Sequence, residues 1–280
     1  MGGVRMKCTD QLDRPARKRD DVMRLHMIAA ATVAGALLAA PGHAQGFYVS
    51  GTVGAAMQSD SDNSGATSAD FLTGNGGALP AGTPIASGTS VGWETEFDNG
   101  MSYSAAVGYR YSPSFRGEVQ LAMSKADVDT HKNVMLGGGS IDALDAGALT
   151  GSADTLGVTV ADVVADGRGD TKTTAIFVNG YYDFANDSGF TPYVGAGIGY
   201  AKTDVTFKPS GVGIIDDDDN GLAYQVMAGA TYSFNERWDV FGQYTYRSVE
   251  DGKYKVDLFP ANLEVENKSN LIEVGIRYKF

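Results

Sequence analysis

An acidic run, Asp216 to Gly221, contains the residues best suited to hold a metal ion. Its letters DDDDNG place Asp216, Asp218 and Asn220 at the spacing with which an EF-hand calcium loop begins. The bidentate glutamate that completes such a loop would fall at Met227, inside an expected strand. A complete EF-hand is therefore excluded. The run is expected to be a solvated loop, with a loosely held divalent ion as the alternative.

His131 is the one imidazole that could serve a catalytic site, because His26 and His43 lie in a segment expected to be removed on export. It comes just after an expected strand, and an imidazole can act as the general base for a serine nucleophile. No serine motif accompanies it in the sequence. We therefore expect a surface histidine, a protein that is not an enzyme, and no cofactor.

Six charged side chains share the polar face of strands whose other face is apolar: Arg110, Arg116, Glu118, Arg247, Glu273 and Arg277. Charges buried inside a protein must be paired, so these residues predict a salt-bridge network. Arg110, Arg116 and Glu118 are expected to lie close together across a tight turn. Glu273 is expected to meet Arg247 on the preceding strand.

The strands that carry these side chains are marked by a period of two, as in Asn270–Phe280 (NLIEVGIRYKF), where an apolar face alternates with a largely polar one. Similar segments occur at 47–58, 101–112, 115–126, 172–184, 190–205, 222–234 and 238–248. Very short connections between them alternate with very long ones. This pattern predicts an all-β fold, an eight-stranded antiparallel transmembrane β-barrel built as an up-and-down meander with long extracellular loops.

One further segment, Val91–Phe97 (VGWETEF), also alternates and precedes Asp98-Asn99-Gly100. Counting it would give nine strands, whereas single-chain bacterial barrels have an even number. It is therefore expected to be an outer extension of the second strand with a bulge, or a small hairpin in the first loop.

The strand sequences resemble the OmpA-type transmembrane barrel and its relatives, the OmpX and opacity-protein group. The matching segments are FYVSGTVG (47–54), SYSAAVGYRYSPSFRGEVQLAMS (102–124), GYYDF (180–184), TPYVGAGIGYAKT (191–203) and IEVGIRYKF (272–280). The resemblance covers the expected strands and none of the long loops. It implies insertion by the barrel assembly machinery, aided by periplasmic chaperones, with Ile276, Tyr278 and Phe280 as the recognition signal. Full OmpA-type proteins add a peptidoglycan-binding domain, whereas only a barrel domain is expected here.

Residues 1–44 predict a secretory leader. An apolar run at 27–40 follows Arg24 and leads to a small-residue cleavage site at Ala44. The run is shorter than the roughly 20 residues that a membrane anchor needs. Residues 1–22 are too polar for a leader, so Met23 is a candidate initiator. The barrel domain would span 45–280, exported through the Sec pathway to the outer membrane of a Gram-negative bacterium.

The composition limits the classes of partner and the chemistry expected of the protein. The full chain has 22 Lys and Arg against 34 Asp and Glu, a net charge of -12, which disfavours nucleic acid. The single cysteine, Cys8, lies in the leader, so disulfide and thiolate chemistry are excluded from the exported chain. The expected partners are outer-membrane lipid and lipopolysaccharide, whose phosphates a divalent ion at the acidic run would bridge. The protein is expected to be a monomer.

The long segment 129–170 is expected to be a flexible shield over the barrel mouth or a binding surface for an extracellular ligand. A barrel of eight strands is filled by its own side chains. We therefore expect a structural or surface-interaction role, in envelope integrity, adhesion or host contact. The alternative is a narrow porin, for which Gly195, Gly197 and Gly199 would leave space in the lumen.

Overall fold

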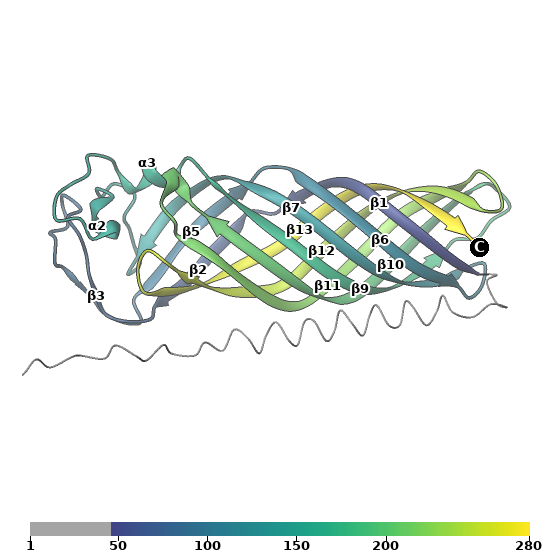
Figure 1. Ribbon diagram of the computed structural model, residues 1–280, viewed down its shortest axis with the longest axis horizontal. Coiled ribbons are helices and arrows are strands. Elements are labelled where there is room, and N and C mark those ends of the chain that lie inside the picture. The colour runs from purple at the N-terminus through teal and green to yellow at the C-terminus, as the bar shows by residue number, and fades with distance from the viewer. Residues whose placement is uncertain (1–45) are drawn as a thin grey trace, which may run out of the picture. The chain divides into compact units, whose positions relative to one another are not determined.

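The computed structural model describes residues 46–280, and the expected leader, its cleavage site and Met23 lie outside them. Eight antiparallel strands form a ring (Figure 1): β1 (Phe47–Gln58), β6 (Gly100–Arg110), β7 (Phe115–Leu136), β9 (Gly169–Asp183), β10 (Phe190–Phe207), β11 (Ile215–Ser233), β12 (Trp238–Val256) and β13 (Ala261–Lys279). Each strand pairs with the next around the ring, and β13 returns to β1, with Lys279 opposite Tyr48. The predicted eight-stranded meander is confirmed.

Two short strands continue the ring beyond the ends of β1 and β6. β2 (Ser61–Thr67) follows β1 and pairs with β13, and β5 (Ser90–Phe97) precedes β6 and pairs with β7. β2 and β5 also pair with each other, so the wall keeps eight strands at this level. The segment Val91–Phe97 is therefore an extension of the second strand, interrupted at Asp98-Asn99. The polar sequence of β2 (SDNSGAT) gave no alternating signal.

The segment expected to be one long loop, 129–170, is strand at both ends, because β7 continues to Leu136 and β9 begins at Gly169. Between them lie β8 (Gly139–Ser140), α2 (Gly147–Thr150) and α3 (Val160–Val164), whose start is fixed by a capping box of Thr159 and Asp162. The first loop holds a hairpin of two short strands, β3 (Phe71–Leu72) and β4 (Pro84–Ile85). The 3₁₀ helix η1 (Pro209–Gly211) follows β10.

The loop between β8 and β9 is tied together by Asp145. Its carboxylate accepts backbone N–H groups from Leu156 at 2.8 Å, Gly147 at 2.9 Å and Gly157 at 2.7 Å. These bonds, that from Leu156 first, hold the pKa of Asp145 below its usual range. These bonds give the connection a local fold around Asp145.

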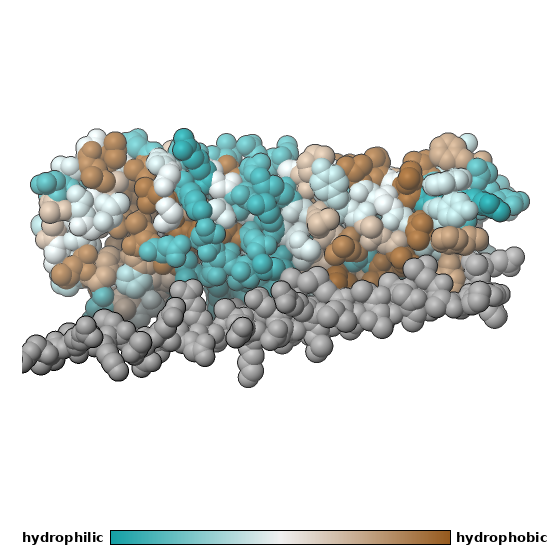
Figure 2. All heavy atoms as spheres, viewed as in Figure 1, coloured by the Kyte–Doolittle hydropathy of each residue, from teal (hydrophilic) through white to brown (hydrophobic). Residues whose placement is uncertain are grey.

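Each long strand reverses its polarity partway along its length. On β13, Ile272, Val274 and Ile276 point outward with exposed fractions of 57%, 61% and 58%, whereas Glu273 and Arg277 are buried inside. Further from the C-terminus, Leu263 and Val265 are the buried side chains. Figure 2 shows hydrophobic residues gathered in a band toward the end of the barrel that carries the C-terminus, and hydrophilic residues over the adjoining stretch. The membrane therefore surrounds the end of the barrel that carries the C-terminus, and the rest stands in water.

The apolar interior of the water-exposed part forms the largest core cluster, whose most buried members are Val160, Val205, Phe207, Ile215 and Leu263. It lies inside the ring formed by β2, β5 and the outer halves of the long strands. Among residues 46–280, none of the helices is long and apolar enough to cross a bilayer.

Candidate functional site

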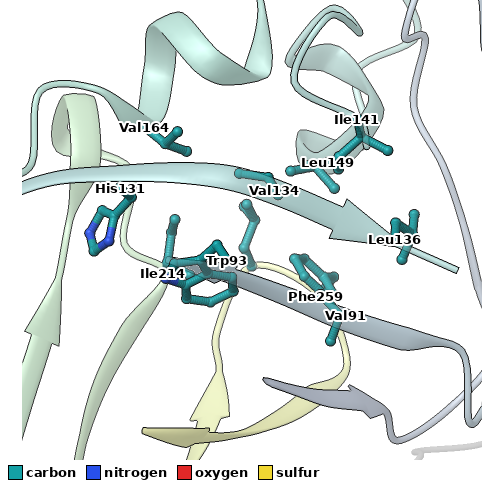
Figure 3. A pocket seen from close by; sticks show the side chains of 11 residues that line it. Val91, Trp93, His131, Val134, Leu136, Ile141, Leu149, Val164, Ile214 and Phe259 are labelled. Carbon is teal, nitrogen blue, oxygen red and sulfur yellow. The ribbon is translucent and has the colours of Figure 1, made fainter. Parts of the chain in front are cut away.

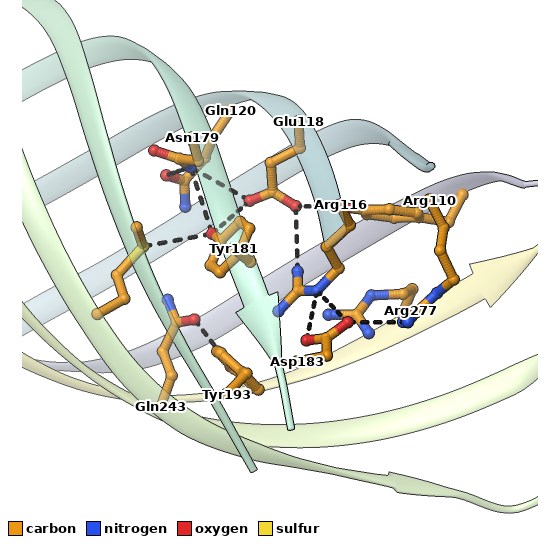
Figure 4. Close-up of polar contacts among 12 residues, drawn as sticks. Arg110, Arg116, Glu118, Gln120, Asn179, Tyr181, Asp183, Tyr193, Gln243 and Arg277 are labelled. Atoms are coloured by element: carbon orange, nitrogen blue, oxygen red, sulfur yellow. Dashed lines mark hydrogen bonds and ion pairs between the residues drawn. The ribbon is translucent and has the colours of Figure 1, made fainter. Parts of the chain in front are cut away.

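The membrane-embedded lumen is centred on Arg116, which β7 points inward. Its Nε lies 3.1 Å from Asp183 Oδ1 on β9, and its Nη1 lies 3.9 Å from Glu118 Oε2 (Figure 4). Arg110 Nη1 lies 2.8 Å from Asp183 Oδ2, so two arginines share one carboxylate. The guanidinium of Arg116 also stacks 3.7 Å above the ring centre of Tyr181.

A second charged group lies on β12 and β13. Asp239, which is 2% exposed, accepts from Lys279 Nζ at 2.7 Å and from Arg277 Nη1 at 3.4 Å. Arg277 lies between two aromatic rings, 5.0 Å from that of Tyr48 and 4.9 Å from that of Phe241. Asp183 and Asp239 were not included in the network expected from the sequence. Strand alternation in GYYDF and WDVF places both on the inward face and is the signal that could have identified them.

Glu273 does not meet Arg247, so the expected pair is wrong. Glu273 accepts hydrogen bonds from four neutral donors: Thr52 at 3.0 Å, Ser102 at 3.3 Å, Gln243 at 3.0 Å and Thr245 at 3.3 Å. Arg247 donates to Gln225 Oε1 at 3.1 and 3.2 Å. The structure therefore places the six predicted charged residues on the inner wall, but in separate groups.

A layer of amides fills the cross-section above the charges. Asn179 donates to Gln120 Oε1 at 3.0 Å, and Gln225 donates to the same oxygen at 2.8 Å. The three inward glycines of β10 leave no space, because a Cβ on Gly195 would meet Tyr181, on Gly197 Asn179, and on Gly199 Phe177. The cavity beside Arg116 and Arg277 measures about 10 Å³ as the space open to the centre of a water molecule. This is at the limit for one water.

The acidic run lies in strand β11 rather than in a loop. Asp216 and Asp218 point outward and face lysines, Lys208 Nζ at 2.8 Å and Lys202 Nζ at 3.6 Å respectively. Asn220 follows on the same face. Within the described part of the chain, no group of three or more His, Cys, Asp or Glu side chains could hold a metal ion. The metal site suggested by the D-x-D-x-N-G spacing is therefore not formed.

Asp217 and Asp219 of the same run connect β11 to β12 where the two strands no longer pair through their backbones. The ladder between β11 and β12 reaches outward only to Ala223 opposite Val249, beyond which the strands separate. Asp219 Oδ2 accepts the backbone N–H of Lys253 at 2.9 Å, and Asp217 Oδ2 accepts that of Lys255 at 3.2 Å. These carboxylates therefore replace carbonyl groups as partners for β12.

Replacing Asp217 and Asp219 together by alanine should free the two β12 amides. Hydrogen bonds to a charged acceptor contribute about 1.5–3 kcal/mol, so we expect hydrogen exchange at Lys253 and Lys255 to become at least about tenfold faster. The matched control replaces the outward pair, Asp216 and Asp218, by alanine. Equal acceleration in both double variants, measured by deuterium exchange, would show that loss of charge alone loosens β12.

His131 is buried, which corrects the expected surface position. It lies within β7, is 2% exposed, and its Nδ1 is 2.8 Å from Thr95 Oγ1 on β5. Burial lowers its pKa to about 4, and Asp166 opposes this only in part. The ring is therefore neutral at pH 7, inside the apolar outer core.

The C-terminal residues expected to guide assembly lie at the membrane-embedded end of β13. Ile276 and Phe280 are outward and exposed, with Phe280 donating its N–H to Phe47 O at 3.1 Å. The rings of Tyr278 and Phe280 meet edge to face, with centres 5.1 Å apart. Trp238 packs against Tyr278 at 4.9 Å. An aromatic cluster thus marks one rim of the apolar band.

Known proteins share this architecture. The family model described as outer membrane protein beta-barrel domain matches residues 27–280. Outer membrane protein PagN of Salmonella typhimurium is 31% identical over 124 residues, which cover 40% of this chain and 52% of PagN, so the chain spans about half the length of that relative. The crystal structure of OprG from Pseudomonas aeruginosa matches with a TM-score of 0.50 at 16% identity, covering 84% of this chain and 96% of OprG.

Neisserial surface protein A matches with a TM-score of 0.42 at 18% identity, covering 84% of this chain and 98% of that one. At 16% identity, the match to OprG shows a likeness of fold alone. The family model, in contrast, extends over every strand of the ring. The chain therefore belongs to the outer membrane protein beta-barrel domain family, and its place is the bacterial outer membrane.

Proposed function

We propose that this protein is a plugged, non-enzymatic barrel that presents a rigid extracellular surface for contact with a host or environmental ligand. The observation that carries the proposal is the filled interior, in which charges, amides and an apolar core follow one another along the barrel. A barrel without an open lumen offers its outer surface as the place for interaction. The folded loops around α2, α3 and the β3–β4 hairpin supply that surface.

A narrow porin is the second candidate, and one observation favours it. Each of three buried arginines has an N–H group without a partner: Arg116 Nη2, Arg247 Nη1 and Arg277 Nε. Waters that satisfied these donors would form the beginning of a hydrated path. Against this, Gln120, Asn179 and Gln225 hydrogen-bond across the lumen.

The proposal predicts separate behaviour for the loop surface and the lumen. Exchange of residues 142–158 for a Gly-Ser segment of equal length should abolish adherence of expressing cells to epithelial cells, at unchanged surface display. The purified wild-type protein should show no conductance steps in planar bilayers. The triple alanine variant of Gln120, Tyr181 and Gln225 should also fail to conduct, because the ion pairs around Arg116 and the apolar outer core still close the lumen.

The outcomes distinguish the two candidates. Regular conductance steps from the wild-type barrel, with adherence unaffected by loop exchange, would favour the narrow porin. Adherence that depends on the loop segment in the absence of conductance would support the surface-interaction role.

We also propose the route by which the chain reaches the membrane. The leader sequence supports Sec export with cleavage after Ala44, and the C-terminal residues Ile276, Tyr278 and Phe280 support recognition by the assembly machinery. Contact with lipopolysaccharide is supported by four lysines that point outward just above the apolar band: Lys125, Lys172, Lys202 and Lys268. Ammonium groups at this height suit the phosphates of the outer leaflet.

A further inference from the structure

Four strands of the ring carry the same pair of opposite charges on the outward face, just above the apolar band. In each pair a lysine lies nearer the membrane, and a carboxylate lies two residues farther from it on the same strand. The order is the same on β7 and β10, which run away from the membrane, and on β9 and β13, which run toward it. The pairs, together called the paired belt, are Lys125–Asp127 at 2.5 Å, Lys172–Asp170 at 2.8 Å, Lys202–Asp204 at 2.6 Å and Lys268–Glu266 at 2.6 Å.

The pairing of β7 with β9 does not explain this order. Lys125 lies directly opposite Lys172. Asp127 lies directly opposite Asp170, so like charges face each other across the two strands. Like charges in that position destabilise a sheet, whereas opposite charges would stabilise it. The charges are therefore arranged in two layers, with the lysines next to the membrane and the carboxylates above them.

The pair on β10 fits the same layers. Lys202 lies opposite Thr174 of β9. Asp204 lies opposite Lys172, so the β10 pair is displaced in register by one pleat toward the membrane. The strands of a barrel are tilted, and residues at one height therefore shift in register from strand to strand. Exposed ion pairs contribute little to stability, so the repeated order needs another explanation.

The interior of the outer half offers no room for a polar ligand at this level. A cavity there, whose lining includes Trp93, His131 and Leu136 (Figure 3), measures about 20 Å³ as the space open to the centre of a water molecule. The surface open to this space is apolar. A polar ligand must therefore contact the outside of the wall, where the paired belt faces the lipid headgroups.

The two layers are complementary to a headgroup that carries both charges. Each lysine of the paired belt already has a carboxylate partner, so the belt has no excess of positive charge to hold a simple anion. A headgroup with a phosphate and an ammonium replaces both partners at once, because the phosphate accepts from lysine and the ammonium donates to the carboxylate. Two residues of strand separate the layers by roughly 6.6 Å. The flexible four-carbon stem of lysine adapts this separation to a small headgroup.

We propose that the paired belt binds outer-leaflet lipids whose headgroup carries a phosphate and a primary ammonium, the chemistry of phosphoethanolamine. The phosphate lies beside the lysines, and the ammonium lies beside the carboxylates, farther from the membrane. The inference rests on the proposed contact of the four lysines with lipid phosphates and adds the carboxylates as the determinant of the headgroup. The strongest site is expected between β7 and β9, where two lysines and two carboxylates lie side by side.

The test measures lipid binding to the full exported chain by native mass spectrometry in a neutral detergent. The probes are the dioleoyl forms of phosphatidylethanolamine, phosphatidylglycerol and phosphatidylcholine. Phosphatidylglycerol has no ammonium, and the trimethylammonium of phosphatidylcholine has no N–H to donate. Phosphatidylethanolamine should bind about fivefold more tightly than either, the effect expected of one charge contact near the membrane surface. Soluble O-phosphoethanolamine at the same concentration should not displace it.

The decisive variant reverses the two pairs on β7 and β9. It combines Lys125→Asp with Asp127→Lys and Asp170→Lys with Lys172→Asp, which keeps the net charge and an ion pair within each strand. The preference for phosphatidylethanolamine should disappear. A second variant, Asp127→Asn with Asp170→Asn, keeps the lysines and should bind phosphatidylglycerol at least as tightly as phosphatidylethanolamine.

The matched control reverses an exposed ion pair that lies farther from the membrane. Lys253 Nζ on β12 lies 3.1 Å from Glu264 Oε1 on β13. The variant Lys253→Glu with Glu264→Lys should keep the preference of the wild type, because neither residue belongs to the paired belt.

Four results would contradict the proposal. Equal binding of phosphatidylethanolamine and phosphatidylglycerol would leave only a lysine–phosphate contact, and absence of binding by all three lipids would remove that contact as well. An unchanged preference in the reversed variant, folded as judged by its heat-modifiable migration, would mean that the order of the charges has no role. Displacement by O-phosphoethanolamine would assign the site to a soluble ligand. Adherence through the loops is measured separately and does not depend on any of these results.

Discussion

Replacement of Asp183 by asparagine should cost about 3–5 kcal/mol of unfolding free energy, because it leaves Arg116 and Arg110 without their shared carboxylate. Arg116 is buried, and its other carboxylate contact, Glu118, is longer at 3.9 Å. The change in shape is minimal, so the loss would reflect charge. The measurement is the urea unfolding of the barrel in detergent or lipid vesicles.

Asp218→Asn is the matched control for that loss of charge. Asp218 also contacts a basic side chain, Lys202 at 3.6 Å, but on the outer surface in water. Exposed pairs of this kind contribute about 0–1 kcal/mol. If the Asp183 and Asp218 variants unfolded at the same urea concentration, the buried ion pairs would not be holding the lumen together.

Acidification should destabilise the barrel through His131. The pKa of His131 is about 4 in the folded protein, lowered by burial from 6.5, whereas the unfolded chain keeps the higher value. The stability that comes from the neutral ring is complete above pH 6.5 and is lost as the pH falls from 6.5 toward 4. The loss reaches roughly 3 kcal/mol at pH 4, from 1.36 kcal/mol for each pKa unit.

His131→Gln separates this effect from the titration of surface carboxylates. Glutamine keeps an acceptor within reach of Thr95 but has no proton to gain. Urea unfolding at pH 7 and pH 4.5 should therefore show a smaller drop in stability for the variant than for the wild type. An identical drop in the two proteins would mean that His131 titrates normally and is not buried in the folded state.

The sequence predicted the membrane-embedded strands well and their outer halves poorly. The third strand was expected to end at Ala126 and continues to Leu136, and the last was expected to begin at Asn270 and begins at Ala261. In lipid the apolar side chains face outward, and in water they face inward. The alternation of apolar side chains on the outer face of a strand therefore ends at the membrane boundary, although the strand itself continues.

The charged residues were identified more readily than their partners. Alternation assigns a side chain to the inner wall, but the pairs depend on the stagger between strands. Glu273 lies opposite Gln243, and Arg247 lies opposite Ser269, four residues further along β13. At about 3.3 Å per residue, roughly 13 Å separates the two levels. The stagger is set by the turn after Val256 and by the bulge between Val249 and Gly252, and neither is evident from composition.

The reversal of polarity along each strand fixes the height at which the barrel sits in the bilayer. On β13 the outward side chains change from Lys268 to Ile272 within two repeats of the pleat, with Asn270 between them. If the barrel sank deeper, a ring of lysines would enter the hydrocarbon, which costs about 2–4 kcal/mol for each lysine that reaches the midplane. Rising would lift Ile272 and its neighbours into water. The apolar outer core and the loops above it are thereby held clear of the lipid surface, at a constant distance from it.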